Sequence, residues 1–198
     1  MELLVIGKDE GVERILARVA FAHALGHKQV TILFPQPDKT HRAAIRQLTE
    51  RFPDLICAVH VRNQQEASKA RRLYEAVYGD ATRELFESRA VTHILEPEAG
   101  ARPDFLHHRN SGLNQVLLAL CKETPKRPGK EIVTTLALVM RSRRRETVVG
   151  RMQQNARFCH KYKVPYRVTS GAADIFEQRD KTCLDALART LLAGVCRK

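Results

Sequence analysis

The sequence has no long apolar run and no pattern that would direct the chain to a membrane or out of the cell. No stretch of about 18 apolar residues occurs among its 198 positions, whereas a membrane-spanning helix needs about 20. The first residues, Met1–Ile6, lack the basic start and small-residue cleavage site of a signal peptide. Five scattered cysteines form no CxxC pair, which indicates reduced thiols. We therefore expect a cytoplasmic protein with no membrane partner.

The sequence also lacks the usual motifs for metal ions and nucleotide cofactors. Its eight histidines form neither HxH nor HExxH, and no GxGxxG or Walker loop occurs. His60 and His93 lie inside predicted strands and would converge in a barrel. A lone histidine in a strand is more often packed or hydrogen-bonded than a ligand. We expect no metal ion, no cofactor and no catalytic residue in this chain.

Three carboxylates follow one predicted strand, a position at which carboxylates can hold metals or transfer protons. They are Glu96, Glu98 and Asp104. No residue of known role accompanies them in the sequence, so we interpret this segment as a solvated loop.

Positive charge is abundant, and it is concentrated in one segment. The chain carries 34 basic and 22 acidic residues, a net charge of +12. Residues 1–101 hold 14 of each sign, whereas residues 102–163 hold 14 basic and 4 acidic side chains, a net charge of +10. Such a local excess is typical of a surface that binds a polyanion. Without a secretion signal or a lipid-binding helix, nucleic acid is the polyanion we expect.

Short apolar runs alternate with helical patterns along the chain. The predicted strands are 3–6, 29–33, 55–61, 90–95, 132–138 and 166–169. The predicted helices are 11–25, 40–51, 64–78, 81–88, 111–122, 146–162 and 182–192, with caps at Thr40 and Ser111. Repeated βα units predict a parallel sheet in a single α/β domain over residues 1–198. The sheet is either open and doubly wound or closed into a (β/α) barrel. A barrel of this chain would be trimmed, because a full barrel needs roughly 200–250 residues.

A dense arginine cluster follows the predicted strand 132–138. Arginine binds phosphate through two parallel hydrogen bonds, and no aromatic residue interleaves the cluster to stack on bases. We therefore predict contacts with an RNA backbone rather than with stacked bases. The predicted RNA-binding residues are Arg109, Lys126, Arg127, Lys130, Arg141, Arg143, Arg144 and Arg145.

Small residues follow the last predicted strand, in Thr169-Ser170-Gly171-Ala172. One interpretation is a tight turn in which Gly171 takes an unusual φ and Thr169 or Ser170 caps the next segment. The other is a contact with phosphate or an RNA backbone, because open α/β sheets bind ligands at the carboxyl ends of their strands.

Two segments of the second half resemble a known family. The segment His107–Glu123, HHRNSGLNQVLLALCKE, is similar to a stretch of the archaeal and eukaryotic ribonuclease P protein component 3 family, its p30-type subunit. That stretch has an Arg, a Gly and an Asn or Asp before HVL. The segment Asn155–Leu191 resembles the family's later block, in which a KYKVP-like run leads into a strand and then TSGA.

The resemblance implies a TIM-barrel-like α/β fold and a role as a protein subunit of ribonuclease P, the endoribonuclease that removes the 5′ leader of precursor tRNA. In such enzymes the RNA subunit and its Mg²⁺ ions carry out the hydrolysis, and this subunit stabilises the catalytic RNA. The implied partners are the ribonuclease P RNA, protein component 2, the other protein subunits and precursor tRNA. The implied RNA or partner contacts are Asn110, Thr169, Ser170, Gly171 and Arg179.

The chain also departs from the family pattern, and two alternatives stay open. The family often has an aspartate near its first strand, where Leu3–Ile6 offers none, and the arginine cluster replaces a segment rich in Ser, Leu and Asn. A stand-alone metal-dependent phosphoesterase barrel would use His60, His93 and Glu96 as ligands. A generic basic RNA-binding protein would need no ribonuclease P partner.

Overall fold

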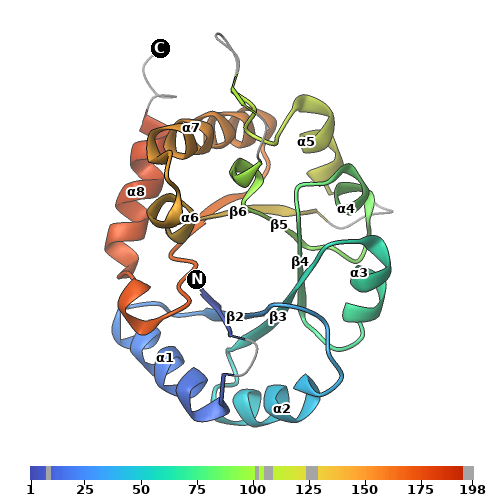
Figure 1. Cartoon of the computed structure of the whole chain (residues 1–198), viewed down its shortest axis with the longest axis vertical. Helices are drawn as coiled ribbons and strands as arrows, with labels where there is room; N and C mark the ends of the chain where they lie inside the picture. Colours follow the sequence, from blue (N-terminus) through green and yellow to red (C-terminus); the bar gives the residue numbers. More distant parts are fainter. Residues whose placement is uncertain (8–9, 101–102, 105–108, 124–128, 194–198) are drawn as a thin grey trace.

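Seven parallel strands form a nearly closed barrel with helices around its outside (Figure 1). The computed structural model describes residues 1–7, 10–100, 103–104, 109–123 and 129–193. The strands pair in chain order and are β1 (Glu2–Val5), β2 (Val30–Phe34), β3 (Ile56–Val61), β4 (Ala76–Gly79), β5 (His93–Leu95), β6 (Glu131–Thr135) and β7 (Tyr166–Thr169).

Helices connect successive strands. The α-helices are α1 (Val12–Ala24), α2 (His41–Arg51), α3 (Gln64–Ala70), α4 (Arg83–Glu87), α5 (Gln115–Cys121), α6 (Leu136–Arg141), α7 (Arg145–Tyr162) and α8 (Lys181–Ala193). Two short 3₁₀ helices, η1 (Pro97–Ala99) and η2 (Ile175–Glu177), follow β5 and β7. Within the described ranges, none of the helices has both the length and the apolar character needed to span a bilayer.

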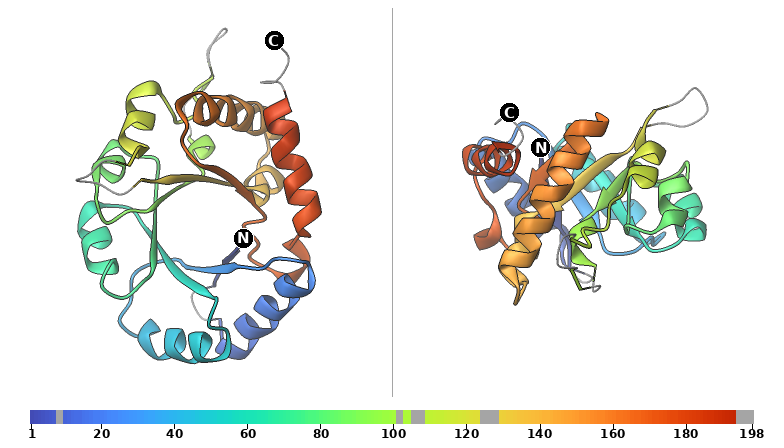
Figure 2. Two further views of the ribbon diagram at one scale, coloured as in Figure 1. Left: turned by 180° about the vertical axis from the view of Figure 1, so that it is seen from behind. Right: turned by 90° about the horizontal axis from the view of Figure 1, so that it is seen from above.

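The ring of strands closes between β7 and β1. Just beyond β7, Ala172 forms a parallel bridge with Leu4, and its carbonyl oxygen accepts a hydrogen bond from the Val5 N–H at 2.8 Å. Figure 2 shows the ring from behind, with the helices packed on its outer surface. The prediction of a trimmed, TIM-barrel-like fold is therefore confirmed, and the open doubly wound sheet is not the closure that this chain adopts.

Apolar side chains pack on both faces of the ring. The inner cluster contains only strand residues, namely Leu3, Leu33, Ala58, Ala76, Tyr78 and Val133. On the outer face, alternate strand residues such as Leu4 and Ile32 pack against helical residues such as Ile15 and Val19. Because both faces are covered, the strands appear in the sequence as continuous apolar runs.

Two predicted elements differ from the structure. The predicted helix 64–78 ends at Ala70, and its last residues form β4, whose backbone pairs with β3 and β5. The predicted strand 132–138 ends at Thr135, whose Oγ1 accepts a hydrogen bond from the Leu138 N–H at 3.1 Å. This side-chain cap starts α6 and turns the rest of the apolar run into helix.

Thr40 stands at the N-cap position of α2 as predicted, whereas the predicted cap Ser111 is wrong. The Thr40 side chain makes no capping hydrogen bond. Helix α5 begins after Asn114, whose Oδ1 accepts from the Leu117 N–H at 2.9 Å, because an Asx side chain at this position satisfies a free N–H of the first turn. Ser111 is buried instead.

Arg18 of α1 stabilises the closure of the ring. Its side chain is almost fully buried, and Nη2 donates to the carbonyl oxygens of Ala172 at 2.7 Å and Val5 at 3.1 Å. Nη1 donates to both carboxylate oxygens of Glu10 at 2.8 Å. The guanidinium group thus joins the first and last strands and is neutralised by a buried carboxylate.

We predict that Arg18→Met destabilises the protein by about 3 kcal/mol, because it removes the partner of a buried carboxylate and two hydrogen bonds across the closure. Urea unfolding measures this loss. The matched control is Arg46→Met, since the Arg46 side chain is 82% exposed and pairs with its helical neighbour Glu50. That variant should lose less than about 1 kcal/mol. Equal losses in the two variants would contradict the role of Arg18.

Candidate nucleic-acid interface

The chain after β5 folds inward, so the interpretation of Glu96, Glu98 and Asp104 as a solvated loop is wrong. Glu98 in η1 is fully buried and accepts hydrogen bonds from Asn155 Nδ2 at 2.9 Å and Thr134 Oγ1 at 3.1 Å. Burial raises the pKa of Glu98 to about 7. These contacts attach the turn after β5 to both α7 and β6, because Asn155 belongs to α7 and Thr134 to β6.

The Arg151 side chain of α7 binds the backbone of the same turn. The guanidinium group donates to the carbonyl oxygens of Glu98 at 3.1 Å and Gly100 at 2.6 Å, and to the Asp104 carboxylate at 2.8 Å. Desolvation opposes ionisation of Asp104, but hydrogen bonds from Arg151 and from the Asn110 N–H hold its pKa below the usual value. Side chains of α7 therefore hold the segment that follows β5 in place.

Arg109, which precedes α5 in the chain, packs against the same helix, α7. A Cβ on Gly150 of α7 would come within 2.1 Å of Arg109 Nη1, so the guanidinium group packs directly on the helix backbone. Gln154 Nε2 also donates to the Arg109 carbonyl oxygen at 3.0 Å. The Asn110 side-chain amide donates to the carbonyl oxygen of Pro103. The structure thus brings Arg109 to α7, while the Asn110 side chain stabilises its own loop.

A cavity of about 640 Å³ lies between this turn and the start of α7, and we call it the arginine cavity. Arg141, Arg143, Arg144 and Arg151 contribute to its lining. Arg141 Nη2 is paired with Glu177 at 2.6 Å. Within the described ranges, the guanidinium groups of Arg143 and Arg144 make no hydrogen bond or ion pair, and both residues are exposed. These two cations are therefore available to an anion.

The arginine cluster does not follow β6 directly, as the sequence predicted, because α6 intervenes. Arg143 and Arg144 precede α7, and Arg145 begins it and donates to the Met140 carbonyl oxygen at 3.2 Å. Three cations thus lie at the positive end of the helix macrodipole, where each is unfavourable by about 0.3–1 kcal/mol at low ionic strength. The free N–H groups of a first helical turn are suited to phosphate, and a bound anion would relieve this repulsion.

The turn after β7 supports the barrel closure. Gly171 has a φ of +63°, which agrees with the turn predicted from the sequence. Thr169 and Ser170 are buried, and Ser170 Oγ donates to the Glu2 carboxylate and accepts from the Ala172 N–H at 3.1 Å. Because Thr169, Ser170 and Gly171 are buried in this turn, the geometry favours the structural interpretation over an RNA contact.

Neither Arg179 nor Lys130 lines the arginine cavity. Arg179 Nη1 donates to the carbonyl oxygens of Phe176 and Gln178, each at 2.8 Å, and so holds its own loop. Lys130 is buried, and its Nζ donates to the Val91 carbonyl oxygen at 2.7 Å. Since a buried ammonium group cannot reach a phosphate backbone, this geometry corrects the prediction for Lys130. Two further predicted residues, Lys126 and Arg127, lie outside the described residues.

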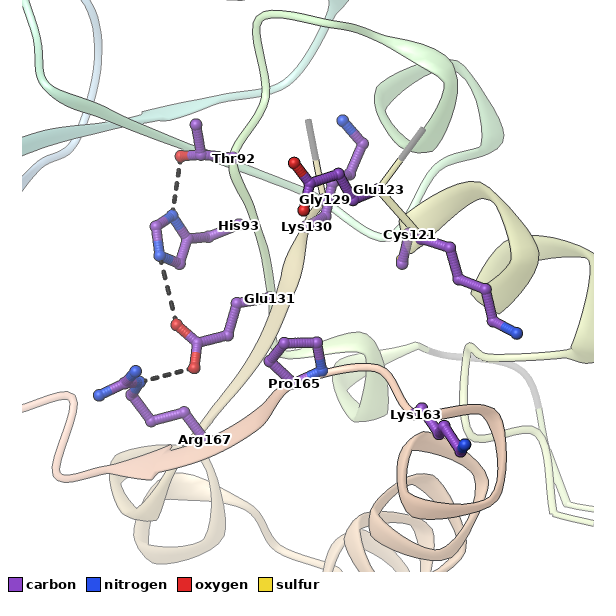
Figure 3. Close-up of a pocket in the computed structure, with 11 residues that line it drawn as sticks. Thr92, His93, Cys121, Glu123, Gly129, Lys130, Glu131, Lys163, Pro165 and Arg167 are labelled. Atoms are coloured by element: carbon purple, nitrogen blue, oxygen red, sulfur yellow. Dashed lines mark hydrogen bonds and ion pairs between the residues drawn. The ribbon is translucent and has the colours of Figure 1, made fainter. Parts of the chain in front are cut away.

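A second cavity, of about 630 Å³, opens at the amino-terminal ends of β5, β6 and β7 (Figure 3). Glu131 lies there between Arg167, whose Nε is 2.8 Å away, and His93, whose Nε2 is 3.5 Å away. Desolvation opposes ionisation of Glu131, but these two partners keep its pKa below the usual value. The His93 ring stacks on Tyr78 with centroids 4.4 Å apart. Glu131 is therefore already paired with partners from β5 and β7.

The three would-be metal ligands do not form one site. His60 pairs with Asp80 at 2.8 Å. His93 lies 3.5 Å from Glu131 and stacks on Tyr78 of β4, the strand that separates it from His60. Burial raises the pKa of Glu96, which accepts a hydrogen bond from Thr135 Oγ1. In the part of the chain that the structure describes, no three His, Cys, Asp or Glu side chains are grouped so as to hold a metal ion.

The fold has a counterpart among solved structures. A chain in the cryo-EM structure of archaeal ribonuclease P with mature tRNA superposes with a TM-score of 0.62 and 17% sequence identity, covering 96% of this chain and 82% of that chain. This chain shares the fold of that ribonuclease P chain. No protein-family model and no curated protein sequence matches it.

Two other solved structures give weaker superpositions. Phospho-2-dehydro-3-deoxyheptonate aldolase of Thermotoga maritima has a TM-score of 0.47 and 9% identity, covering 98% of this chain and 70% of that chain. A prolidase-like protein of Bifidobacterium longum has a TM-score of 0.36 and 13% identity, covering 97% of this chain and 48% of that chain. Both scores are too low to bear on the function of this chain.

Two features of this surface could not be recognised in the sequence. Arg151 is separated from its partners Asp104 and Glu98 by about fifty positions, so no local pattern reveals the network. Phe176 is 87% exposed and is followed by Glu177, which pairs with Arg141. An aromatic residue thus lies beside the arginine cluster in the fold, although none interleaves it in the sequence.

We predict that Gly171→Ala destabilises the protein more than Gly26→Ala. Both glycines have a positive φ, which costs about 1 kcal/mol or more for other residues. A Cβ at Gly26 would meet nothing within 4 Å, whereas a Cβ at Gly171 would lie 2.5 Å from the Thr135 Cβ. Urea unfolding of both variants separates backbone strain from this clash. Equal losses would show that the turn after β7 adapts to a side chain.

Proposed function

We propose that this chain is a protein subunit of ribonuclease P and that it binds RNA through the arginine cavity. The observation that carries the proposal is the pair Arg143 and Arg144, two exposed cations at the start of α7 that have no side-chain partner among the residues the structure describes. Two lines support the choice of ribonuclease P. The sequence resembles the component 3 family, and the fold matches a chain of an archaeal ribonuclease P structure.

The surface is suited to a phosphate backbone. Guanidinium groups bind phosphate bidentately, and the positive end of the α7 macrodipole adds to their attraction. Arg151 is held by the turn after β5 and Arg141 by Glu177, so these two arginines shape the wall of the cavity. Arg143 and Arg144 are the side chains that we expect to contact RNA, together with Arg109, which packs against α7 at Gly150.

The chain is proposed to support catalysis rather than to perform it. In this proposal the ribonuclease P RNA, with its Mg²⁺ ions, hydrolyses precursor tRNA, and this subunit stabilises the catalytic RNA together with protein component 2 and the other protein subunits. The holoenzyme would act in the cytoplasm. Among the described residues, the would-be metal ligands His60 and His93 are paired with two different carboxylates, Asp80 and Glu131, which favours this role over a phosphoesterase.

We predict that replacing both Arg143 and Arg144 with Ala weakens binding to the ribonuclease P RNA of the same organism most strongly at low salt. Each lost phosphate contact lowers the slope of log K against log salt by roughly 0.7–0.9, so the double variant should lose about 1.5 units of slope. Filter binding at several salt concentrations measures both affinity and slope.

The control for this prediction removes the same charge elsewhere. Arg46 and Arg83 on α2 and α4 have side chains that are 82% and 75% exposed. Replacing both with Ala should leave most of the slope intact. An unchanged slope and affinity in the Arg143 and Arg144 variant, or an equal loss in the control, would contradict the proposed interface.

A further inference from the structure

Phe176 is the most exposed of the large apolar side chains in the described part of the chain. Its side chain lies in η2, directly after the barrel closure, and the residue is 87% exposed. The next most exposed large apolar residue, Val116 in α5, is 60% exposed. The phenyl ring therefore packs against little of its own protein.

The backbone that carries Phe176 is held in place from several sides. The Asp174 carboxylate accepts from the Phe176 N–H at 3.1 Å, and Arg179 donates to the Phe176 carbonyl oxygen at 2.8 Å. Asp174 also pairs with Arg14 of α1 at 3.1 Å. Glu177 accepts from the Ala173 N–H at 2.8 Å. An exposed ring on a fixed turn loses little conformational entropy when it binds a ligand.

The same turn is attached to the arginine cavity. Glu177, the residue after Phe176, pairs at 2.6 Å with Arg141, which lines that cavity together with Arg143 and Arg144. Desolvation opposes ionisation of Glu177, but hydrogen bonds from the Ala173 N–H and Arg141 keep its pKa below the usual value. The ion pair thus attaches the turn that carries the exposed ring to the surface that includes Arg143 and Arg144.

We propose that Phe176 is a stacking platform for an unpaired nucleobase of the RNA whose phosphates contact Arg143 and Arg144. This inference rests on the proposed function and adds the class of RNA element, a single strand or a bulged base rather than a continuous duplex. Aromatic side chains next to a basic surface bind single strands in this manner, because every base has a π-face. Duplex RNA keeps its bases stacked on one another and offers none to the ring.

The surroundings of Phe176 favour a base over an apolar protein partner. The side chains attached to its turn belong to charged residues, namely Arg14, Asp174, Glu177 and Arg141. The buried centre of a protein interface is instead depleted of charged residues. A nucleotide combines a flat base with a charged phosphate. The ring of Phe176 suits the base, and the nearby arginines suit the phosphate.

Tryptophan at position 176 provides a direct test, since the chain contains no other tryptophan. The full-length Phe176→Trp variant is titrated with a ten-nucleotide single-stranded RNA and with a blunt duplex of the same length. We expect the single strand to quench the indole fluorescence to saturation and the duplex to leave it unchanged. Absence of quenching by bound single strand would overturn the proposal.

Two further variants separate stacking from other roles of the ring. Stacking of one base contributes about 1–3 kcal/mol, so Phe176→Ala should weaken single-strand binding by roughly 5- to 150-fold and leave duplex binding unchanged. Phe176→Leu keeps an apolar side chain but no ring face, and it should lose nearly as much. Val116→Ala, a change at another exposed apolar residue, is the control and should bind like the unmodified protein.

The outcomes distinguish this inference from the proposed function. If the Arg143 and Arg144 variant loses RNA affinity while Phe176→Ala and Phe176→Leu bind normally, stacking is wrong and the RNA interface stands. If Phe176→Ala binds RNA normally but releases a co-purifying protein, the ring is a protein contact and stacking is again wrong. If the unmodified protein binds neither these two RNAs nor the ribonuclease P RNA, both the inference and the proposed function fail.

Discussion

The carbonyl oxygen of Ala172 is the group on which the rest of the structure depends. It accepts hydrogen bonds from the Val5 N–H and from Arg18, and so it closes a ring whose last strand has only four residues. The tight turn at Gly171 is required to bring this carbonyl to β1. The same turn directs the chain into η2, which carries Phe176 and pairs with α6 through Glu177 and Arg141.

Helix α7 organises the other side of the proposed RNA surface. Its buried Asn155 and Arg151 bind the turn after β5, and its Gly150 leaves room for the Arg109 guanidinium group. These contacts use polar groups that would be costly to bury without partners. With the middle of the helix fixed in this way, Arg143 and Arg144 lie directly before its first turn, where their mutual repulsion favours a bound anion.

The fold could be predicted from the sequence because apolar runs about every 30 residues, separated by helical patterns, predict repeated βα units. The charge of residues 102–163 likewise predicted a basic surface. Other features depend on contacts between distant segments. Strand β4 was missed because pairing with β3 and β5 decides its conformation, and Lys130 was misplaced because its ammonium group finds buried carbonyl oxygens. The burial of Glu98 could not be predicted from its neighbours in the sequence, because its partner Asn155 is 57 positions away.

The central claim, that this chain is a protein subunit of ribonuclease P, is tested most directly by purifying it from its own cells with an affinity tag and sequencing the RNA that remains bound. The account predicts that the ribonuclease P RNA is the dominant species, that a component 2 protein is present, and that the eluate cleaves the 5′ leader from precursor tRNA. A preparation that lacks this RNA, or that cleaves precursor tRNA after all RNA has been removed, would contradict it.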